Sequence, residues 1–540
     1  MPDFAYDQKT PFFSMLVPTV DTVRYAFIFE HSVDVMKPVL FTGHSGVGKS
    51  VVVAKAMQDM VEIGAWGRVD LSFSAQTSAK RTQETIESKL EKKKKTLLGP
   101  PPGKRLVMFI DDVNMPALET YGASPPVELL RQFLDYKGFY DRQKLFWKGI
   151  ADVCAVAACG PPGGGRNSLT PRYVRHHTVV AMTQPSAEAM KRIFLSIVDG
   201  SLKLNGIADI MALGKPIVDA SVDLFFQVLN DLKPIPAKSH YTFNLRDVSK
   251  IVQGVLMMRP TAIPSKETLA KLWAHESLRV FCDRLIDDED RNYFTGMVAD
   301  ALKVQFKMSW SHEELFESEQ RLVFGDYTKM GVPREDRKYE EVADTSKLSQ
   351  LFTDYLDEYN AENKEMRLVF FWDACDHISR LARVLRQPRG NAMLVGVGGS
   401  GKQSLTRFSA FMSEMKCFQI ELTKGYGYNE FREDLKKLYF TAGTEKTEDG
   451  KIGCPIVFLF ADTQVVEVSC FACLHTKRAP YSNTGPSLRR VRRSRLSKIS
   501  TTFSTPARCP TSLPTTSGKR SPRPCAHSRR TSVCPRRRTT

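Results

Sequence analysis

The stretch that decides the fold is Val39-Leu40-Phe41-Thr42-Gly43-His44-Ser45-Gly46-Val47-Gly48-Lys49-Ser50, followed directly by Val51-Val52-Val53-Ala54. An apolar run typical of a buried strand ends in a glycine-rich turn, and the turn leads into a helical pattern. This order and spacing match the phosphate-binding signature GxxxxGK[ST] in its strand–loop–helix context. A glycine turn with a chance lysine is the alternative, but the complete pattern indicates a nucleoside triphosphate site in an α/β fold.

Each residue type in this loop has a chemical reason. Glycine lets successive backbone N–H groups approach phosphate oxygens, and the helix that starts near Lys49 directs its positive end at the same anion. Lys49 would reach the β- and γ-phosphates, and the Ser50 hydroxyl would bind Mg²⁺. The residues predicted to bind nucleotide here are Gly43, His44, Ser45, Gly46, Val47, Gly48, Lys49 and Ser50.

A second element of the same site follows at residues 106–112. The apolar run 106–110 is of the buried parallel-strand type and ends in Asp111-Asp112. Asp111 would hold Mg²⁺ through water, and Asp112 would orient the attacking water, although a glutamate is more usual there. The alternative is a strand that merely ends in a polar turn.

A second phosphate-loop pattern begins at Gly396, 353 residues after Gly43. Its glycines and lysine are intact, but Gln403 stands where a hydroxyl would bind Mg²⁺, and an amide suits that near-octahedral ion poorly. The apolar run 456–461 ends in Asp462, and Thr463 replaces the second carboxylate. The predicted nucleotide-binding residues are Gly396, Gly398, Gly399, Ser400, Gly401, Lys402, Gln403 and Asp462.

The net charge of +17 belongs to one end of the chain. Residues 468–540 hold 17 of the 77 Lys and Arg residues and no Asp or Glu, so residues 1–467 carry 60 basic and 60 acidic residues. A segment rich in Ser, Pro and Arg cannot bury a core, and we expect it to be disordered. A shifted reading frame, an alternative C-terminus and a nucleic-acid-binding tail are three explanations; we favour the first and do not expect nucleic acid as a partner.

Other sequence signals are weaker. No run of about 18 apolar residues indicates a membrane span, and the N-terminus lacks the features of a secretory signal, which favours the cytosol and no membrane partner. Cys470, Cys473 and His475 could form half of a zinc site, but incidental thiols are the simpler interpretation. Residues 82–95 read as a helix that ends in four lysines, and residues 150–159 as the next core strand.

Five further motifs give the chain a specific resemblance: it resembles the third AAA+ module of axonemal dynein heavy chains, and from residue 366 the start of the fourth. The match covers residues 1–467. The motifs are Asp111-Asp112-Val113-Asn114-Met115-Pro116, Tyr121-Gly122-Ala123-Ser124-Pro125-Pro126-Val127-Glu128-Leu129-Leu130-Arg131-Gln132, Gly163-Gly164-Gly165-Arg166-Asn167, Thr170-Pro171-Arg172-Tyr173-Val174-Arg175-His176 and Phe243-Asn244-Leu245-Arg246-Asp247.

The resemblance implies roles for single residues. Arg175, with Arg172 as second choice, resembles the arginine finger that acts in the neighbouring module's site; a surface arginine is the alternative. Arg246 resembles sensor 2, which contacts the γ-phosphate. The sensor-1 position, usually a polar Asn, is Gly160, which has no side chain to hold a water and therefore puts hydrolysis in doubt.

The resemblance also implies the domain plan and the function. We expect an AAA+ large domain at 1–185, a helical lid at 186–300, a helical connection at 301–365, a partial large domain at 366–467 and the tail at 468–540. The fold class is α/β: a parallel sheet flanked by helices, with an α-helical lid.

By the same resemblance, the chain is the ATP- and Mg²⁺-binding part of a microtubule motor of the cilium or flagellum axoneme, without stalk or microtubule-binding domain. The implied partners are other modules of the dynein ring, together with intermediate chains, light chains and microtubules reached through other parts. The alternative is a regulatory nucleotide-binding module with little hydrolysis of its own. We expect the chain alone to bind ATP and hydrolyse it poorly.

Overall fold

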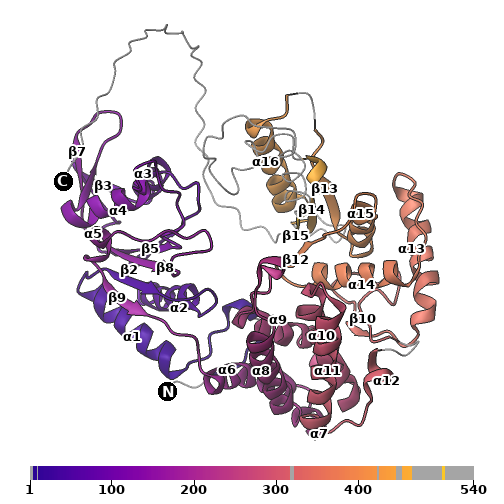
Figure 1. The fold of residues 1–540 in the computed structure, drawn as a ribbon. Helices are drawn as coiled ribbons and strands as arrows, with labels where there is room; N and C mark the ends of the chain where they lie inside the picture. The colour runs from indigo at the N-terminus through magenta and orange to yellow at the C-terminus, as the bar shows by residue number, and fades with distance from the viewer. Residues whose placement is uncertain are drawn as a thin grey trace, which may run out of the picture.

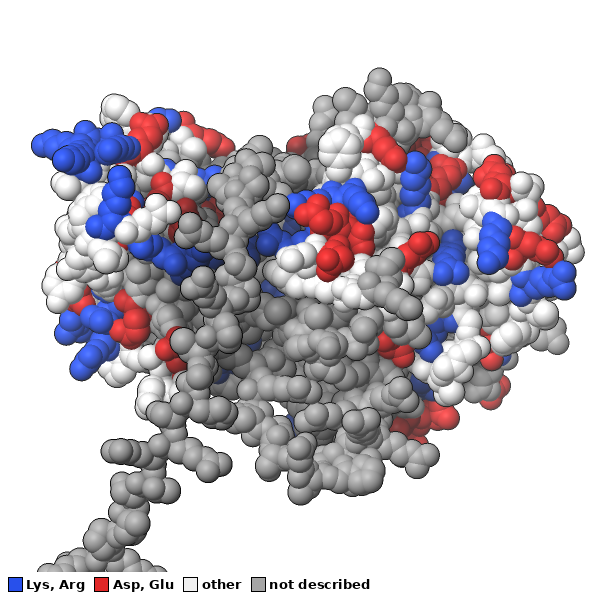
Figure 2. Space-filling model, turned by 90° about the horizontal axis from the view of Figure 1, so that it is seen from above, with Lys and Arg blue, Asp and Glu red and all other residues white. Residues whose placement is uncertain are grey.

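A computed structural model describes residues 4–8, 10–316, 321–422, 425–445, 453–464 and 501–504. Figure 1 shows an α/β part in residues up to about 185, a helical part beside it, and a second α/β part beyond the helices. On the face shown in Figure 2, basic and acidic side chains are interspersed over the described residues, as expected from the neutral composition of residues 1–467.

The first α/β part is built on a five-stranded parallel sheet in the order β2-β5-β8-β1-β9. Its central strands β1, β5 and β8 are apolar along most of their length because both faces of the sheet are covered there, whereas the edge strand β2 alternates between buried and exposed residues. The strand expected at residues 150–159 begins only at Val153, since Ile150 belongs to another sheet. The strands are β1 (Val39–Thr42), β2 (Trp66–Ser72), β5 (Arg105–Asp111), β8 (Val153–Cys159) and β9 (Thr178–Ala181).

Alternate residues of the central strand β5 enter two different cores. Val107 and Phe109 pack with residues of α1 and α2, whereas Met108 and Ile110 pack with residues of α3 and α4. The sheet therefore lies between two helical layers, and its carboxyl edge is left open for a site. The helices are α1 (Val20–Asp34), α2 (Lys49–Glu62), α3 (Ala79–Glu87), α4 (Pro125–Tyr136) and α5 (Pro171–Val174).

The helix predicted for residues 82–95 is wrong in its second half. Helix α3 ends at Glu87, and the four lysines fall in and just after a strand of a small sheet in the order β3-β4-β7-β6. A helix would bring the like charges of Lys92 and Lys95 together at i,i+3 positions, whereas here Lys93 reaches Asp152 at 2.7 Å. The strands are β3 (Glu91–Lys94), β4 (Leu97–Gly99), β6 (Gly138–Tyr140) and β7 (Trp147–Ile150).

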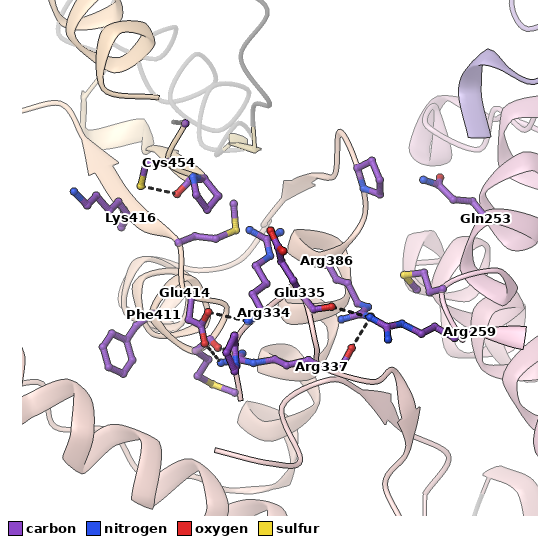
Figure 3. Close-up of a pocket in the computed structure, with 18 of the residues that line it drawn as sticks. Gln253, Arg259, Arg334, Glu335, Arg337, Arg386, Phe411, Glu414, Lys416 and Cys454 are labelled. Carbon is purple, nitrogen blue, oxygen red and sulfur yellow. Dashed lines mark hydrogen bonds and ion pairs between the residues drawn. The ribbon is translucent and has the colours of Figure 1, made fainter. Parts of the chain in front are cut away.

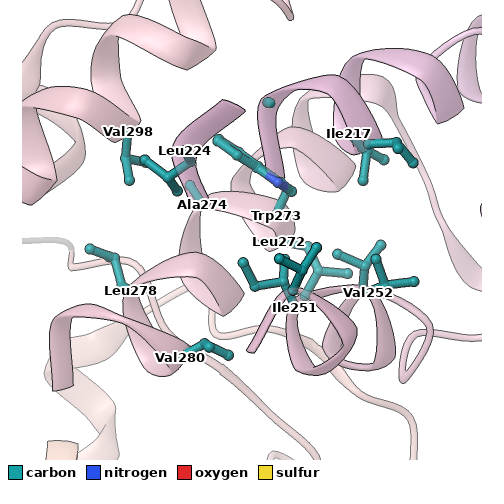
Figure 4. Packing of buried hydrophobic residues seen from close by; sticks show 14 of the residues in the cluster. Ile217, Leu224, Ile251, Val252, Leu272, Trp273, Ala274, Leu278, Val280 and Val298 are labelled. Atoms are coloured by element: carbon teal, nitrogen blue, oxygen red, sulfur yellow. The ribbon is translucent and has the colours of Figure 1, made fainter. Parts of the chain in front are cut away.

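Residues 186–304 form the helical part. Its core surrounds the fully buried Trp273, whose indole N–H donates to the Ser221 hydroxyl at 2.8 Å (Figure 4). Val248, Ile251 and Val252, which share one face of α9, are buried in this core. The elements are α6 (Ala187–Leu202), α7 (Ala208–Met211), α8 (Gly214–Asp231), η2 (Pro236–Lys238), α9 (Leu245–Val255), η3 (Pro260–Ala262), α10 (Lys266–Val280), η4 (Cys282–Arg284) and α11 (Asp288–Val304); the short η1 (Phe12–Ser14) precedes α1.

The second α/β part begins with helices that lead to the second loop. One face of α14 is buried through Ala374, Ile378, Leu381 and Leu385, whereas Phe371 precedes the helix and is exposed. A two-stranded ladder lies in the connection that we expected to be helical. The elements are α12 (His312–Phe316), β10 (Phe324–Gly325), β11 (Glu340–Glu341), η5 (Thr345–Lys347), α13 (Leu348–Glu362), α14 (Trp372–Arg386), α15 (Lys402–Met412) and α16 (Tyr428–Thr444).

The second sheet has the order β12-β15-β14-β13, and β15 runs antiparallel to both of its neighbours. In the first sheet the corresponding place, between the loop strand and the acid-capped strand, belongs to the parallel strand β8. Strand β15 comes from the segment 468–540, whose other residues lie outside the described residues. The elements are β12 (Asn391–Met393), β13 (Lys416–Gln419), β14 (Ile456–Phe460), η6 (Asp462–Gln464) and β15 (Thr501–Ser504).

A buried ion pair joins the helical part to the second α/β part. Glu276 of α10 is fully buried and receives hydrogen bonds from the Arg383 guanidinium of α14 and, at 2.9 Å, from the Tyr339 hydroxyl. Burial alone would raise the pKa of Glu276, but the charge and hydrogen bonds of Arg383 outweigh it and hold the pKa well below its usual range. Asp376 extends the contact by pairing with Arg279 at 3.3 Å.

We expect Arg383→Met to lower the free energy of unfolding of the helical part by about 3–5 kcal/mol, because it leaves the Glu276 charge buried and unpaired. Urea denaturation followed by the far-ultraviolet circular dichroism of the helices measures this. The exposed Arg367, paired with Glu365 at 2.9 Å, provides a matched control, and Arg367→Met should leave the midpoint unchanged. Equal midpoints for the two variants would contradict the role given to the pair.

Candidate nucleotide site

The first glycine-rich loop lies at the carboxyl end of β1 and leads directly into α2. Gly46 and Gly48 have φ values of 89° and 92°, which side-chain-bearing residues rarely adopt. A Cβ atom on Gly43 would lie 2.3 Å from the Met182 carbonyl oxygen, so the loop passes too close to the chain after β9 for any side chain there. The backbone therefore curls tightly while His44 and Ser45 remain exposed at its tip.

Lys49 is folded back across this loop. Its ammonium donates to the carbonyl oxygens of Gly43 at 2.7 Å and His44 at 2.8 Å, and the residue is buried. Burial lowers the pKa of Lys49, an effect that the neighbouring Asp112 and Asp111 carboxylates oppose. A buried cation held by carbonyl groups at the start of a helix suits the phosphates of a nucleotide.

Ser50 and Asp111, predicted as the magnesium ligands, are brought together. The Ser50 hydroxyl donates to Asp111 Oδ2 at 2.6 Å, although the residues lie on α2 and at the end of β5. A hydroxyl and a carboxylate beside a phosphate-binding loop form a donor set that suits Mg²⁺, an ion that prefers oxygen ligands and retains several waters. The residues present therefore fit a magnesium nucleotide.

Asp112 has a left-handed backbone, with φ at 51°, in the residue directly after β5. Aspartate is among the non-glycine residues that adopt this conformation most readily. Its carboxylate lies 3.5 Å from the Arg166 guanidinium, an arginine to which the sequence assigned no role. At the end of β8, Gly160 accepts a hydrogen bond at its carbonyl from the Asn114 amide at 2.8 Å.

The start of α9 meets the same loop from the helical part. The space beside Gly46 is filled by Asn244, whose Cβ and Oδ1 atoms lie 3.5 Å from where a Gly46 Cβ would be. Asn244 caps α9 and accepts from the Arg246 backbone N–H at 2.9 Å. Arg246 is exposed in the first turn of this helix, two residues from the contact with the loop.

Arg175 is placed away from its own module's loop. It is exposed on the residue after α5 and pairs with Asp135 of α4 at 2.9 Å. Arg172, the second choice for the same role, is also exposed. Both arginines thus lie on the surface beside α4 and α5, where they are accessible from outside the module.

The second loop repeats only part of this geometry. The Lys402 ammonium donates to the carbonyl oxygens of Gly396 at 2.9 Å and Val397 at 2.7 Å, as Lys49 does in the first loop. Gln403 Oε1 instead accepts from the Gln419 amide at 3.5 Å, and no hydrogen bond links it to Asp462, both being among the described residues. Met393 and Val395 of this segment are more than half exposed, whereas Val39 and Phe41 of β1 are buried.

The comparisons with known proteins agree on one family. Residues 4–185 match the model of the P-loop containing dynein motor region, residues 200–291 that of the dynein heavy chain ATPase lid domain, and residues 366–475 that of the P-loop containing dynein motor region D4. The chain belongs to the axonemal dynein heavy-chain family.

Its relatives include three axonemal heavy chains. The chain is 49% identical to dynein axonemal heavy chain 6 of Homo sapiens over 467 residues, which are 86% of this chain and 11% of that protein. It is 42% identical to dynein axonemal heavy chain 1 of Mus musculus over 86% of this chain and 11% of the relative. It is 43% identical to dynein axonemal heavy chain 12 of Rattus norvegicus, over 80% of this chain and 14% of that relative. The dynein chain described here thus spans about a tenth of the length of these relatives.

A large cavity lies away from both glycine-rich loops. It has a volume of about 1680 Å³ and lies between the helical part and the second α/β part (Figure 3). Its arginines are held by the protein: Arg259 donates to the Glu335 carbonyl at 2.8 Å, and Arg386 pairs with Asp326 at 2.6 Å. No residue of either glycine-rich loop lines it, so it is not the nucleotide site.

The structure also bears on the metal-binding and membrane-spanning features considered from the sequence. Cys470, Cys473 and His475 lie outside the described residues, and within the described ones no group of three or more His, Cys, Asp or Glu side chains could hold a metal ion. Among the helices that the structure describes, none is long and apolar enough to cross a membrane. Sequence reasoning missed Arg166 and Asn244 as site residues, although both fall within the quoted motifs.

We expect Lys49→Ala to weaken the binding of Mg·ATP at the first loop by at least about 10-fold, because a charge-assisted contact to phosphate is lost. Isothermal titration calorimetry on a Lys402→Ala background isolates this loop. Lys55→Ala is the matched control, since Lys55 lies on the same helix and pairs with Asp59 at 2.6 Å. Unchanged affinity in the Lys49 variant would show that this loop does not hold the phosphates.

We expect the second loop to bind nucleotide with little dependence on Mg²⁺, because an amide replaces the hydroxyl ligand at Gln403. Gln403→Ser should create a clear increase in affinity in excess Mg²⁺ over EDTA. Calorimetry on a Lys49→Ala background measures the nucleotide affinity of the parent and of Gln403→Ser, each in EDTA and in excess Mg²⁺. A strong Mg²⁺ dependence in the parent that is lost in Gln403→Ser would contradict this.

Proposed function

We propose that this chain is an ATP-binding part of a dynein ring, and that its first loop holds ATP with Mg²⁺. The observation that carries the proposal is the 2.6 Å hydrogen bond between Ser50 and Asp111, which joins the loop helix to the acid-capped strand. When bound, the magnesium ion would neutralise charge on the phosphates. Lys49 binds those phosphates, and Asp112 lies where a carboxylate can orient water.

We assign residues 1–185 to the large domain of the third AAA+ module, 186–300 to its lid, 301–365 to a connection, 366–467 to part of the fourth module, and 468–540 to a basic tail. The supporting observations are the change from sheet to helices after β9 and the return to a sheet at β12. Within this division, the start of α9 closes the first site from the lid side, and Arg246 is proposed to face the terminal phosphate there.

The whole protein's role follows from its relatives and is part of the proposal. We place the chain in a motor that assembles as a ring of AAA+ modules, works on microtubules with intermediate and light chains, and resides in the cytoplasm and the axoneme of cilia or flagella. Arg175 supports ring assembly, because an exposed arginine paired only at the module's edge suits action on a neighbouring site.

A regulatory module with little turnover is the second candidate. The pairing of Asp112 with Arg166 favours it, since a carboxylate engaged by a guanidinium is not free to orient water. In that case the nucleotide state of the first site would bias the arrangement of lid and ring without much hydrolysis.

We expect the 540-residue chain alone to hydrolyse ATP slowly, because an arginine supplied by a neighbour contributes about 10³–10⁵-fold in related NTPases. A steady-state ATPase concentration series measures this. If copies associate so that Arg175 of one copy serves another, turnover per chain rises with concentration and falls in Arg175→Ala. Fast turnover that is first order in protein and insensitive to Arg175→Ala would instead show that the same chain supplies the arginine finger of its own site.

A further inference from the structure

Arg166 is held in place by a built turn. The three preceding glycines have φ values of 115°, 57° and 88°, and Gly163 and Arg166 exchange two backbone hydrogen bonds of 3.0 Å. Only glycine adopts such a series of left-handed conformations without strain. The next residue, Asn167, anchors the turn by donating its side-chain amide to the Pro116 carbonyl at 2.6 Å. The position of Arg166 is therefore set by the fold.

The side chain of Arg166 occupies the space at the end of β8 that a side chain on Gly160 would need. A Cβ atom on Gly160 would lie 2.7 Å from both Cδ and Nε of Arg166. No side chain at position 160 can coexist with Arg166 as it lies here. The glycine that seemed to remove a polar group from the site thus makes room for a guanidinium.

The guanidinium points into the nucleotide site. One terminal nitrogen lies 3.5 Å from Asp112 Oδ1, and the side chain is 26% exposed. Its Nε is buried and has no hydrogen-bond partner among the described residues. Its charge also acts on Lys49, where it adds to the larger effect of burial in lowering the pKa of that ammonium. An unpaired buried N–H donor beside the phosphate-binding lysine indicates a missing anionic partner.

We propose that Arg166 binds the γ-phosphate of ATP from within its own module, in the place of the polar side chain that Gly160 lacks. This rests on the proposed function, that the first loop binds ATP. The site therefore distinguishes ATP from ADP through Arg166, whereas Lys49 serves both nucleotides.

The test compares Mg·ADP with the non-hydrolysable Mg·AMPPNP by calorimetry, using the full chain on a Lys402→Ala background. We expect Arg166→Ala to weaken the binding of AMPPNP by about 10- to 100-fold and to leave the affinity for ADP unchanged. Arg142→Ala, at an exposed arginine that pairs with Glu84 at 3.3 Å, is the matched control and should change neither affinity.

Two further variants separate this role from a structural one. Arg166→Lys keeps a charge and should retain part of the preference for AMPPNP. Gly160→Ala keeps the arginine but forces it to move, and should lose the preference as Arg166→Ala does. Thermal unfolding midpoints equal to that of the parent chain establish that each variant is folded.

Three outcomes would overturn the proposal. If Arg166→Ala weakens the binding of ADP and of AMPPNP equally, Arg166 only shapes the loop. Unchanged affinity for both, with Lys49→Ala weakening both, would refute the role of Arg166 and leave the proposed function standing. Unchanged affinities in Lys49→Ala as well would mean that the loop is not the nucleotide site, and both would fail.

Discussion

The first site depends on the parallel order of its sheet. Parallel strands end at the same edge, so the residues that follow β1, β5 and β8 meet there although they are far apart in sequence. The hydrogen bond between Ser50 and Asp111 shows the result at one point, because it closes a gap of 61 residues. Gly160 and the turn that carries Arg166 reach the same edge from β8.

The two glycine-rich loops share the local contacts of the lysine but differ in the sheet that surrounds them. Lys49 and Lys402 make the same contacts to the loop carbonyls, since those depend only on local backbone geometry. The strand beneath the first loop is buried between two parallel neighbours, whereas β12 pairs with the antiparallel β15. The contact that corresponds to Ser50 and Asp111 is absent between Gln403 and Asp462, both described residues. Loop geometry alone therefore does not create a magnesium site.

The buried pair of Glu276 and Arg383 joins the helical part to the helix that leads into the second loop. Glu276 lies on α10, which packs against α9, and α9 begins beside the first loop. Arg383 lies on α14, the helix that leads into β12 and the second loop. Because breaking a buried ion pair is strongly unfavourable, this pair stabilises the contact between α10 and α14.

The sequence by itself determined the local features. The loop residues, the acid-capped strand and the helical character of residues 186–300 followed from motif and periodicity, because each depends on residues close together in the chain. The family followed from the resemblance of five motifs to known sequences. Prediction from sequence failed where local signals were ambiguous, because the lysine run expected to end a helix fell in and just after a strand.

Only the tertiary structure decided which residues meet. Arg166 could not be placed from sequence, since its role depends on Gly160 leaving space six positions earlier and on Asp112 approaching from another strand. The contact of Asn244 with Gly46, and the pairing of Glu276 with Arg383 across 107 positions, likewise join segments with no local relation. Such contacts depend on how whole elements pack, which the residues of a single element do not specify.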